Sequence, residues 1–424
     1  MSFRSAFACV FGMAIILLHI YPSFAQSSGV LTLTRALEIA LAANPRLSAA
    51  DREIGVATGR YVQSKAIPNP ELSFELDNAL GSNVYRGTRS AESTLQLSQL
   101  VELGGKRQAR IAVGAAELDV AHWQSAAVRL EILSETATAF AGVLSAQRRV
   151  RIFESQIVSL NRLIPLLQAR IDAGASPATE ISRAEVAADI VRAERERALT
   201  ELAIARRELT TLMGRNAPEF RSVAGNLNSV GKPPPFQTLL RAVESNPQLM
   251  RFTSLRAQRD AEFLSARLKP IPDLRVAGGW RHYKDTGDDA VRLSLSVPLP
   301  VWDQNSGGIL EAQEMLAKTD SERTASKAAL ILTLGKAYDT MTGSLRELEI
   351  LRNRALPNAR KAAEGTESGY SQGRFTLLDL LDAQNTATQT MLREQEVLIK
   401  FYTALVTIEG LTGIPLHLNY ARPQ

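Results

Sequence analysis

Hydrophobic residues recur every three or four positions over two long stretches of the chain. The first series is Val150, Phe153, Ile157, Leu160, Ile164, Leu167 and Ile171, and the second is Ile331, Leu334, Tyr338, Met341, Leu345 and Leu348. This spacing is typical of a coiled-coil seam. A continuous helix over 106–173 would be about 100 Å long, because each helical residue adds about 1.5 Å. We expect Pro165 and Pro357 to bend these helices rather than to end them.

Shorter stretches alternate between apolar and polar residues, which predicts strands. Leu72, Phe74 and Leu76 alternate with Ser73, Glu75 and Asp77, and residues 291–297 show the same pattern. We place four strands near 70–78, 91–101, 272–283 and 289–299. Strands with one apolar and one polar face suit either a transmembrane barrel or a small soluble sandwich. Four strands cannot close a barrel alone, and open edges are not tolerated in lipid. The long helices therefore favour a barrel that several chains share.

The two halves of the chain carry the same short motifs at nearly constant offset, which indicates an internal duplication. The sequence NPRL at 44–47 recurs as NPQL 202 residues later. Gly174, Glu180 and the LMG at 212–214 recur 199 residues later as Gly373, Asp379 and LTG. We therefore predict a first repeat over 26–213, a linker rich in Gly, Pro and Asn over 214–235, and a second repeat over 236–424.

The first residues read as an export signal. Arg4 precedes an apolar run that is too short to span a membrane comfortably, and a small-residue cleavage site ends at Ala25. We expect residues 1–25 to be removed outside the cytoplasm, and the only cysteine, Cys9, to be removed with them. No lipid anchor is expected, since no cysteine follows the cleavage site. The formal charge of +5 then becomes +4, with basic and acidic residues interspersed, so we expect no nucleic-acid partner.

No arrangement of residues suggests catalysis or a bound cofactor. The sequence GGKR at 104–107 lacks the pattern of a phosphate-binding loop. His122, His282 and His417 are widely separated in the sequence, and the methionines are scattered. We therefore predict a protein that is not an enzyme, has no cofactor and has no tight metal site.

Two aspartates, Asp379 and Asp382, lie three residues apart among leucines, where like charges on one helix face repel. Thr376 and Asp379 fit a capping box at the start of a helix. Capping does not reach Asp382, which lies beyond the first turn. In the first repeat, Ser176 followed by Pro177 predicts a helix N-cap with proline at the first helical position.

Three blocks carry a resemblance to a known family. They are LVELGGKR at 100–107, VPLPVWDQNSG at 297–307 and GYSQGRFTLLDLLDAQ at 369–384. Together with the duplicated plan, they resemble the TolC-like outer-membrane efflux proteins, most closely the CzcC-type branch for heavy-metal cations. The resemblance implies a mainly α-helical fold with a membrane β-barrel. A trimer would form a twelve-stranded barrel, four strands per chain, in the outer membrane of a Gram-negative cell, and a long coiled-coil helical tunnel in the periplasm.

The resemblance also implies a periplasmic entrance, whose candidate residues here are Thr179, Glu180, Tyr370, Arg374, Asp379 and Asp382. We interpret Gly104, Gly105, Pro298 and Pro300 as the bends between strands and helices. The implied partners are a periplasmic membrane-fusion adaptor and an inner-membrane pump of the RND type. Two alternatives remain open at this point. The same fold could serve drug efflux or type I protein secretion, or the chain could be a periplasmic coiled-coil adaptor or scaffold.

Overall fold

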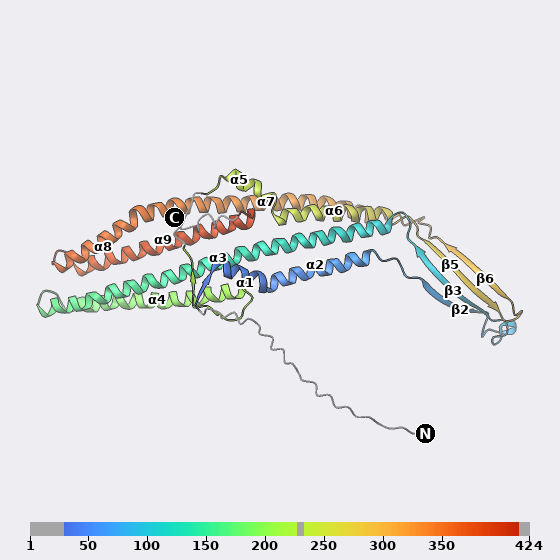
Figure 1. The fold of residues 1–424 in the computed structure, drawn as a ribbon, viewed down its shortest axis with the longest axis horizontal. Coiled ribbons are helices and arrows are strands. Elements are labelled where there is room, and N and C mark those ends of the chain that lie inside the picture. Colours follow the sequence, from blue (N-terminus) through green and yellow to red (C-terminus); the bar gives the residue numbers. More distant parts are fainter. Residues whose placement is uncertain (1–28, 227–232, 415–424) are drawn as a thin grey trace, which may run out of the picture.

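The protein is elongated, with helices along most of its length and a four-stranded sheet at one end (Figure 1). A computed structural model describes residues 29–226 and 233–414. The predicted signal peptide with Cys9, part of the predicted linker, and His417 lie outside the described residues. The prediction of a mainly helical fold with strands attached is confirmed.

Each half of the chain follows the same order of helices and strands. The first half contains β1 (Val30–Thr32), α1 (Leu33–Ala43), α2 (Pro45–Ser64), β2 (Glu71–Asp77), the 3₁₀ turn η1 (Asn83–Tyr85), β3 (Glu92–Val101), α3 (Lys106–Asp172), α4 (Thr179–Leu212) and β4 (Ser222–Ala224). The second half contains α5 (Phe236–Val243), α6 (Pro247–Leu268), β5 (Leu274–Tyr283), β6 (Asp289–Ser296), α7 (Ser306–Ile350), the π-helical turn η2 (Leu351–Ala355), α8 (Leu356–Ser371) and α9 (Leu377–Thr412).

The long helices continue through both prolines, as predicted. α3 has 67 residues and contains Pro165 without interruption, so it is about 100 Å long. In the second half, η2 ends two residues before Pro357, which lies in the first turn of α8. Proline lacks an N–H group and its ring crowds the carbonyl four residues earlier, and the wider π turn accommodates both. The helix changes direction between α7 and α8 (Figure 1).

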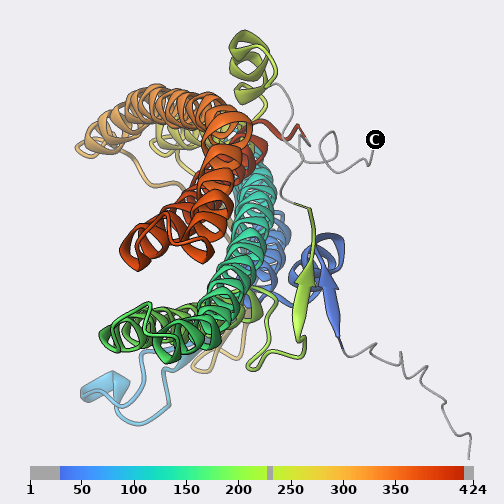
Figure 2. The ribbon, with the colours of Figure 1, turned by 90° about the vertical axis from the view of Figure 1, so that its left-hand side faces the viewer.

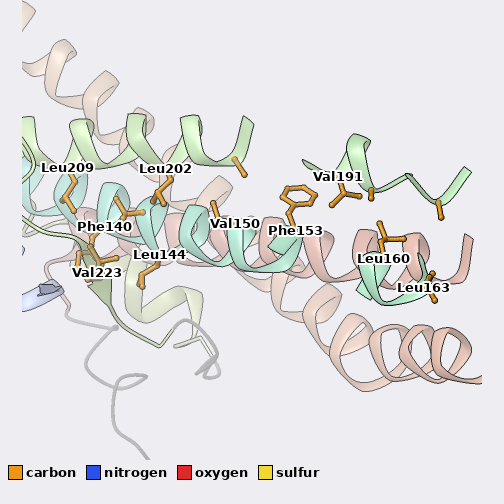
Figure 3. Packing of buried hydrophobic residues seen from close by; sticks show 14 of the residues in the cluster. Phe140, Leu144, Val150, Phe153, Leu160, Leu163, Val191, Leu202, Leu209 and Val223 are labelled. Carbon is orange, nitrogen blue, oxygen red and sulfur yellow. The ribbon is translucent and has the colours of Figure 1, made fainter. Parts of the chain in front are cut away.

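The predicted seams form the core. Val150, Phe153, Leu160 and Leu167 of α3 are buried, and they pack in one cluster with Leu202 and Leu209 of α4 (Figure 3). Leu334, Met341 and Leu348 of α7 are buried in a second cluster with side chains of α9. Seen along the long axis, the helices form an arc rather than a closed bundle (Figure 2).

The repeated sequence motifs contact each other within each half. The Asn44 side chain caps α2 and donates a hydrogen bond of 2.8 Å to the carbonyl of Leu212. Asn246 caps α6 and donates one of 2.9 Å to the carbonyl of Leu411. Gly214 follows the first of these carbonyls with φ +69°, and a Cβ there would lie 2.1 Å from the Ala43 carbonyl oxygen. The duplicated motifs thus join the start of one helix to the end of another.

The sheet has the order β2-β3-β5-β6, and all its neighbouring strands are antiparallel. β3 pairs with β5 from Glu92–Tyr283 to Val101–Leu274, so the two halves of the chain form one sheet. Within the described ranges, no helix is both long and apolar enough to cross a membrane.

Candidate functional site

The tips of the two helical hairpins lie at the end of the molecule opposite to the sheet (Figure 1). One tip is the turn between α3 and α4, and the other is the turn between α8 and α9. All six predicted entrance residues lie in or next to these two turns. The fold therefore brings together residues that are separated by about half the chain.

Tyr370, the second-last residue of α8, connects the two tips. Its side chain is 1% exposed, and its hydroxyl donates a hydrogen bond of 2.9 Å to Oε2 of Glu180 on α4. Burial raises the pKa of Tyr370, and the hydrogen bond to the Glu180 carboxylate raises it further. The phenol therefore stays protonated at neutral pH and acts as the donor to the carboxylate.

Arg170, in the last turn of α3, completes this contact. Its Nη1 donates to the carbonyl oxygen of Tyr370 at 2.9 Å, and its Nε donates to Oγ of Ser176 at 3.1 Å. Its guanidinium carbon lies 4.9 Å from the centre of the Tyr370 ring. Sequence reasoning missed Arg170, because its partner is 200 residues away and nothing in its own surroundings marks it.

The predicted cap at the start of α4 is wrong. α4 begins at Thr179 and no side chain caps it. The N-cap position is Ala178 rather than Ser176, whose hydroxyl accepts a hydrogen bond from Arg170 instead. Thr179 is exposed, and the backbone N–H of Glu180 bonds to the carbonyl of Pro177. The Glu180 carboxylate is thus available to Tyr370.

The start of α9 has the predicted capping box. Oγ1 of Thr376 accepts a hydrogen bond from the N–H of Asp379 at 3.2 Å, and Oδ2 of Asp379 accepts one from the N–H of Thr376 at 2.9 Å. The Thr376 hydroxyl also donates to Oδ2, and these hydrogen bonds lower the pKa of Asp379. The capping interpretation of Asp379 is therefore confirmed, and this exposed carboxylate is ionised at neutral pH.

Arg374 and Asp382 are both exposed near the second tip. The backbone N–H of Arg374 bonds to the carbonyl of Gly369 at 2.8 Å. Within the described part of the chain, neither side chain has an ion pair. The second tip thus presents one positive and one negative side chain at its surface.

The predicted bends lie between strands and helices. Gly104 and Gly105 separate β3 from α3 and have φ of +68° and +81°, and a Cβ on Gly104 would lie 2.6 Å from Cδ1 of Ile271. Pro298 and Pro300 lie in the segment between β6 and α7.

Charged residues that sequence reasoning did not single out fix the first of these bends. Asp273 accepts a hydrogen bond from Nζ of Lys106 at 2.9 Å, which ties the two repeats together. Arg110 pairs with Glu102 and donates to the carbonyls of Ser64 and Ala66 at the end of α2. In the sequence, charged residues flank the glycine pair, and this pattern was the available signal for the ion pairs at the bend.

The apolar face of the sheet is exposed and the opposite face is charged. The exposed apolar side chains include Leu72 (70%), Val291 (79%) and Leu293 (83%). On the opposite face Thr94 and Ser98 are buried. This is the reverse of the burial expected for a soluble sandwich.

All three arginines on the charged face have carboxylate partners. Arg275 pairs with Glu71 at 2.5 Å, Arg281 with Glu92 at 2.8 Å and with Asp77 at 3.4 Å, and Arg292 with Glu75 at 3.3 Å. Arg275 on β5 reaches Glu71 on β2 across β3, so side chains of strands that are not neighbours in the sheet contact each other on this face.

In the described residues there is no group of three or more His, Cys, Asp and Glu side chains that could hold a metal ion. His282 pairs with Asp289 at 2.9 Å on the sheet, and His122 lies within α3.

Comparisons with known proteins agree with this arrangement. The model of the family described as "Outer membrane efflux protein" matches residues 36–215 and 239–414. The cobalt-zinc-cadmium resistance protein CzcC of Cupriavidus metallidurans is 30% identical over 388 residues, which cover 92% of this chain and 91% of the relative. The outer membrane protein TolC of Escherichia coli is 23% identical, with 86% of this chain and 78% of TolC covered.

Solved structures share the fold. A membrane protein of Pseudomonas aeruginosa superposes with a TM-score of 0.79 at 19% identity, covering 90% of this chain and 92% of that one. The channel protein CusC superposes with a TM-score of 0.77 at 15% identity, covering 92% and 95%.

Proposed function

The chain belongs to the outer membrane efflux protein family, and we propose that three copies of it form the outer-membrane duct of a metal-cation efflux system. In this proposal the sheets of the three chains close one barrel in the outer membrane. The helical hairpins form a tunnel in the periplasm. The hairpin tips face the adaptor and the inner-membrane pump, from which the duct receives its cargo.

The observation that carries the proposal is the sheet with its apolar face outward. Leu72, Val291 and Leu293 have no protein neighbours to bury them, and lipid is the surrounding in which such a face is stable. The charged face, in turn, suits a water-filled lumen. Among the described residues, β2 and β6 each have one edge without a partner strand. Lipid does not tolerate unpaired edges, so pairing β6 of one chain with β2 of the next would satisfy both.

The helical body supports the same assembly. The arc of helices in Figure 2 is open on one side, which suits one segment of a tunnel wall. Three chains would bring their hairpin tips together at the periplasmic mouth. There, Asp379, whose pKa is lowered, and the exposed Asp382 would place two carboxylates from each chain around one opening. Rings of carboxylates attract cations and repel anions.

The cargo is proposed from the relatives. CzcC is a cobalt-zinc-cadmium resistance protein that aligns with this chain over nearly its whole length. We therefore expect cobalt, zinc and cadmium cations to be the substrates. The duct need not bind them tightly, since conduction requires that an ion also leaves.

Two experiments test the proposal. The first is fractionation of Gram-negative cells that express the protein. We expect a detergent-extractable trimer in the outer membrane, and a soluble periplasmic monomer would contradict the proposal. The second is deletion of the gene in its native host. We expect increased sensitivity to Co²⁺, Zn²⁺ and Cd²⁺ but unchanged sensitivity to an uncharged dye. The opposite pattern would identify drug efflux as the function.

A further inference from the structure

Arg170 makes contacts with both hairpins of the same chain. It belongs to the α3–α4 hairpin and bonds to Ser176 in its own turn. The same guanidinium donates to the backbone carbonyl of Tyr370 at the end of α8 and lies over the Tyr370 ring. The side chain of Arg170 is partly buried, so these contacts are shielded from much of the competing water.

The chemistry of arginine suits this place. Its planar guanidinium has several N–H groups in a fixed fork, so Nε and Nη1 can donate to two acceptors while the plane faces an aromatic ring. A positive charge is also favourable at the C-terminal end of α8, where the helix carbonyls concentrate negative partial charge. A lysine ammonium is a single point charge, and it cannot make the three contacts together.

Arg170 contacts the backbone carbonyl and the ring of Tyr370, whereas Glu180 contacts its hydroxyl. The carbonyl and the ring of Tyr370 are fixed from one side by Arg170, and the hydroxyl then points to Oε2 of Glu180 at 2.9 Å. If the ring could turn away, this buried hydroxyl would lose its only acceptor on α4 among the described residues. The hydrogen bond that joins α8 to α4 would then be lost.

We propose that Arg170 is a positioning residue for the closed entrance: it holds Tyr370 against Glu180 and thereby keeps the α3–α4 hairpin on α8. This inference rests on the proposed function, in which the hairpin tips form the mouth of the channel. Arg170 contacts no cargo. It acts through Tyr370 alone.

The test is the conductance of purified trimers in planar bilayers. The variants are Arg170→Gln, Arg170→Lys, Tyr370→Phe and the double variant of Arg170→Gln with Tyr370→Phe. Arg162→Gln is the matched control, because Arg162 is an exposed arginine two turns earlier on the same helix. Thermal dissociation of the trimer is measured on every variant, so that a folding defect is seen separately.

We expect Arg170→Gln to open about tenfold more often than the wild type, which corresponds to about 1.4 kcal/mol. Trimer dissociation should change little, and Arg162→Gln should conduct as the wild type does. Arg170→Lys should lie between the wild type and Arg170→Gln, since it keeps the charge without the fork. The double variant should open only slightly more often than Tyr370→Phe, because without the hydroxyl Arg170 keeps only its direct contacts with the carbonyl and the ring of residue 370.

Two results would overturn the inference. Equal conductance of Arg170→Gln and Arg162→Gln, while Tyr370→Phe still opens the channel, would refute the role of Arg170 and leave the proposed function intact. Effects of Arg170→Gln and Tyr370→Phe that simply add would show that the two residues act independently. A wild-type protein that conducts no ions would instead overturn the proposed function, and this inference with it.

Discussion

Arginine substitutions along β6 would test directly which face of the sheet meets lipid. Exposed apolar residues recur at every second position along β6 and in the segment after it: Val291, Leu293, Leu295, Val297, Leu299 and Val301. At about 3.4 Å per residue the 8 residues of β6 make a strand roughly 27 Å long, and a tilt of about 40° reduces its height to about 21 Å. That is close to the apolar band of an outer-membrane barrel, which is about 25 Å tall.

The cost of each substitution follows from its place in this row. Leu295 lies near the middle, where an arginine costs about 2–4 kcal/mol per chain. Three copies in a trimer would therefore lose roughly 6–12 kcal/mol, which is comparable to the whole stability of an ordinary domain. Val291 is the last apolar position before the outward-facing Asp289, so an arginine there should cost about 0–1 kcal/mol. Ser294 faces the charged side, opposite Ala277, and should tolerate arginine.

The assay is the amount of trimer in the outer membrane and its midpoint of thermal dissociation. We expect Leu295→Arg to abolish or strongly reduce the trimer, Val291→Arg to reduce it slightly, and Ser294→Arg to leave it nearly unchanged. Equal tolerance at all three positions would refute the assignment of the faces. The reverse order would place the charged face in the interior of the protein and the apolar face toward water.

Three further predictions follow from the hairpin tips and the repeat motifs. Asp382→Asn should reduce the preference of the channel for cations without affecting trimer stability, and unchanged reversal potentials in a salt gradient would contradict its place at the mouth. Asp379→Asn should lower the dissociation temperature, because the capping box loses its carboxylate. The folded-state pKa of Asp379 is lowered, so the stability that its carboxylate supplies is present above the ordinary pKa of about 3.8 and is lost as the pH falls below that value. The difference in dissociation temperature between Asp379→Asn and the wild type should therefore shrink in acid. Asn246→Ala should destabilise each chain by about 2 kcal/mol, since the buried amide both caps α6 and bonds to Leu411, and denaturant midpoints compared with an exposed Asn385→Ala would measure this.

Features with local signals could be predicted from the sequence. The spacing of the seam and the glycine pair predicted a helix over 106–173, and α3 spans Lys106–Asp172. The capping box of Thr376 and Asp379 needs only residues three positions apart, so the sequence alone revealed it. The alternation in β2 and β6 identified the two faces of the sheet, although it could not say which face meets solvent.

Features that depend on distant contacts could not be predicted. Ser176 before Pro177 carries the local signal of a cap, but Arg170 occupies its hydroxyl and α4 begins two residues later than Pro177. The ion pair of Arg275 with Glu71 requires that the sheet bring side chains of β5 and β2 together across β3. The alternation of residues within one strand does not indicate which side chains of other strands lie close to it.

The two hairpin tips show how a duplication can give equivalent positions different tasks. Glu180 and Asp379 occupy matching places in the repeats, one at each helix start. The Asp379 carboxylate bonds to the N-cap residue of its own helix, Thr376, so it stabilises one hairpin and makes no link to the other. α4 has no side-chain cap, and the Glu180 carboxylate instead reaches Tyr370 on the other hairpin. One of the contacts between the hairpins therefore depends on a helix start whose N-cap residue, Ala178, makes no side-chain cap in the described part of the chain. If the mouth opens by separating the hairpins, Glu180 must release Tyr370, whereas the hydrogen bonds of Asp379 can stay intact.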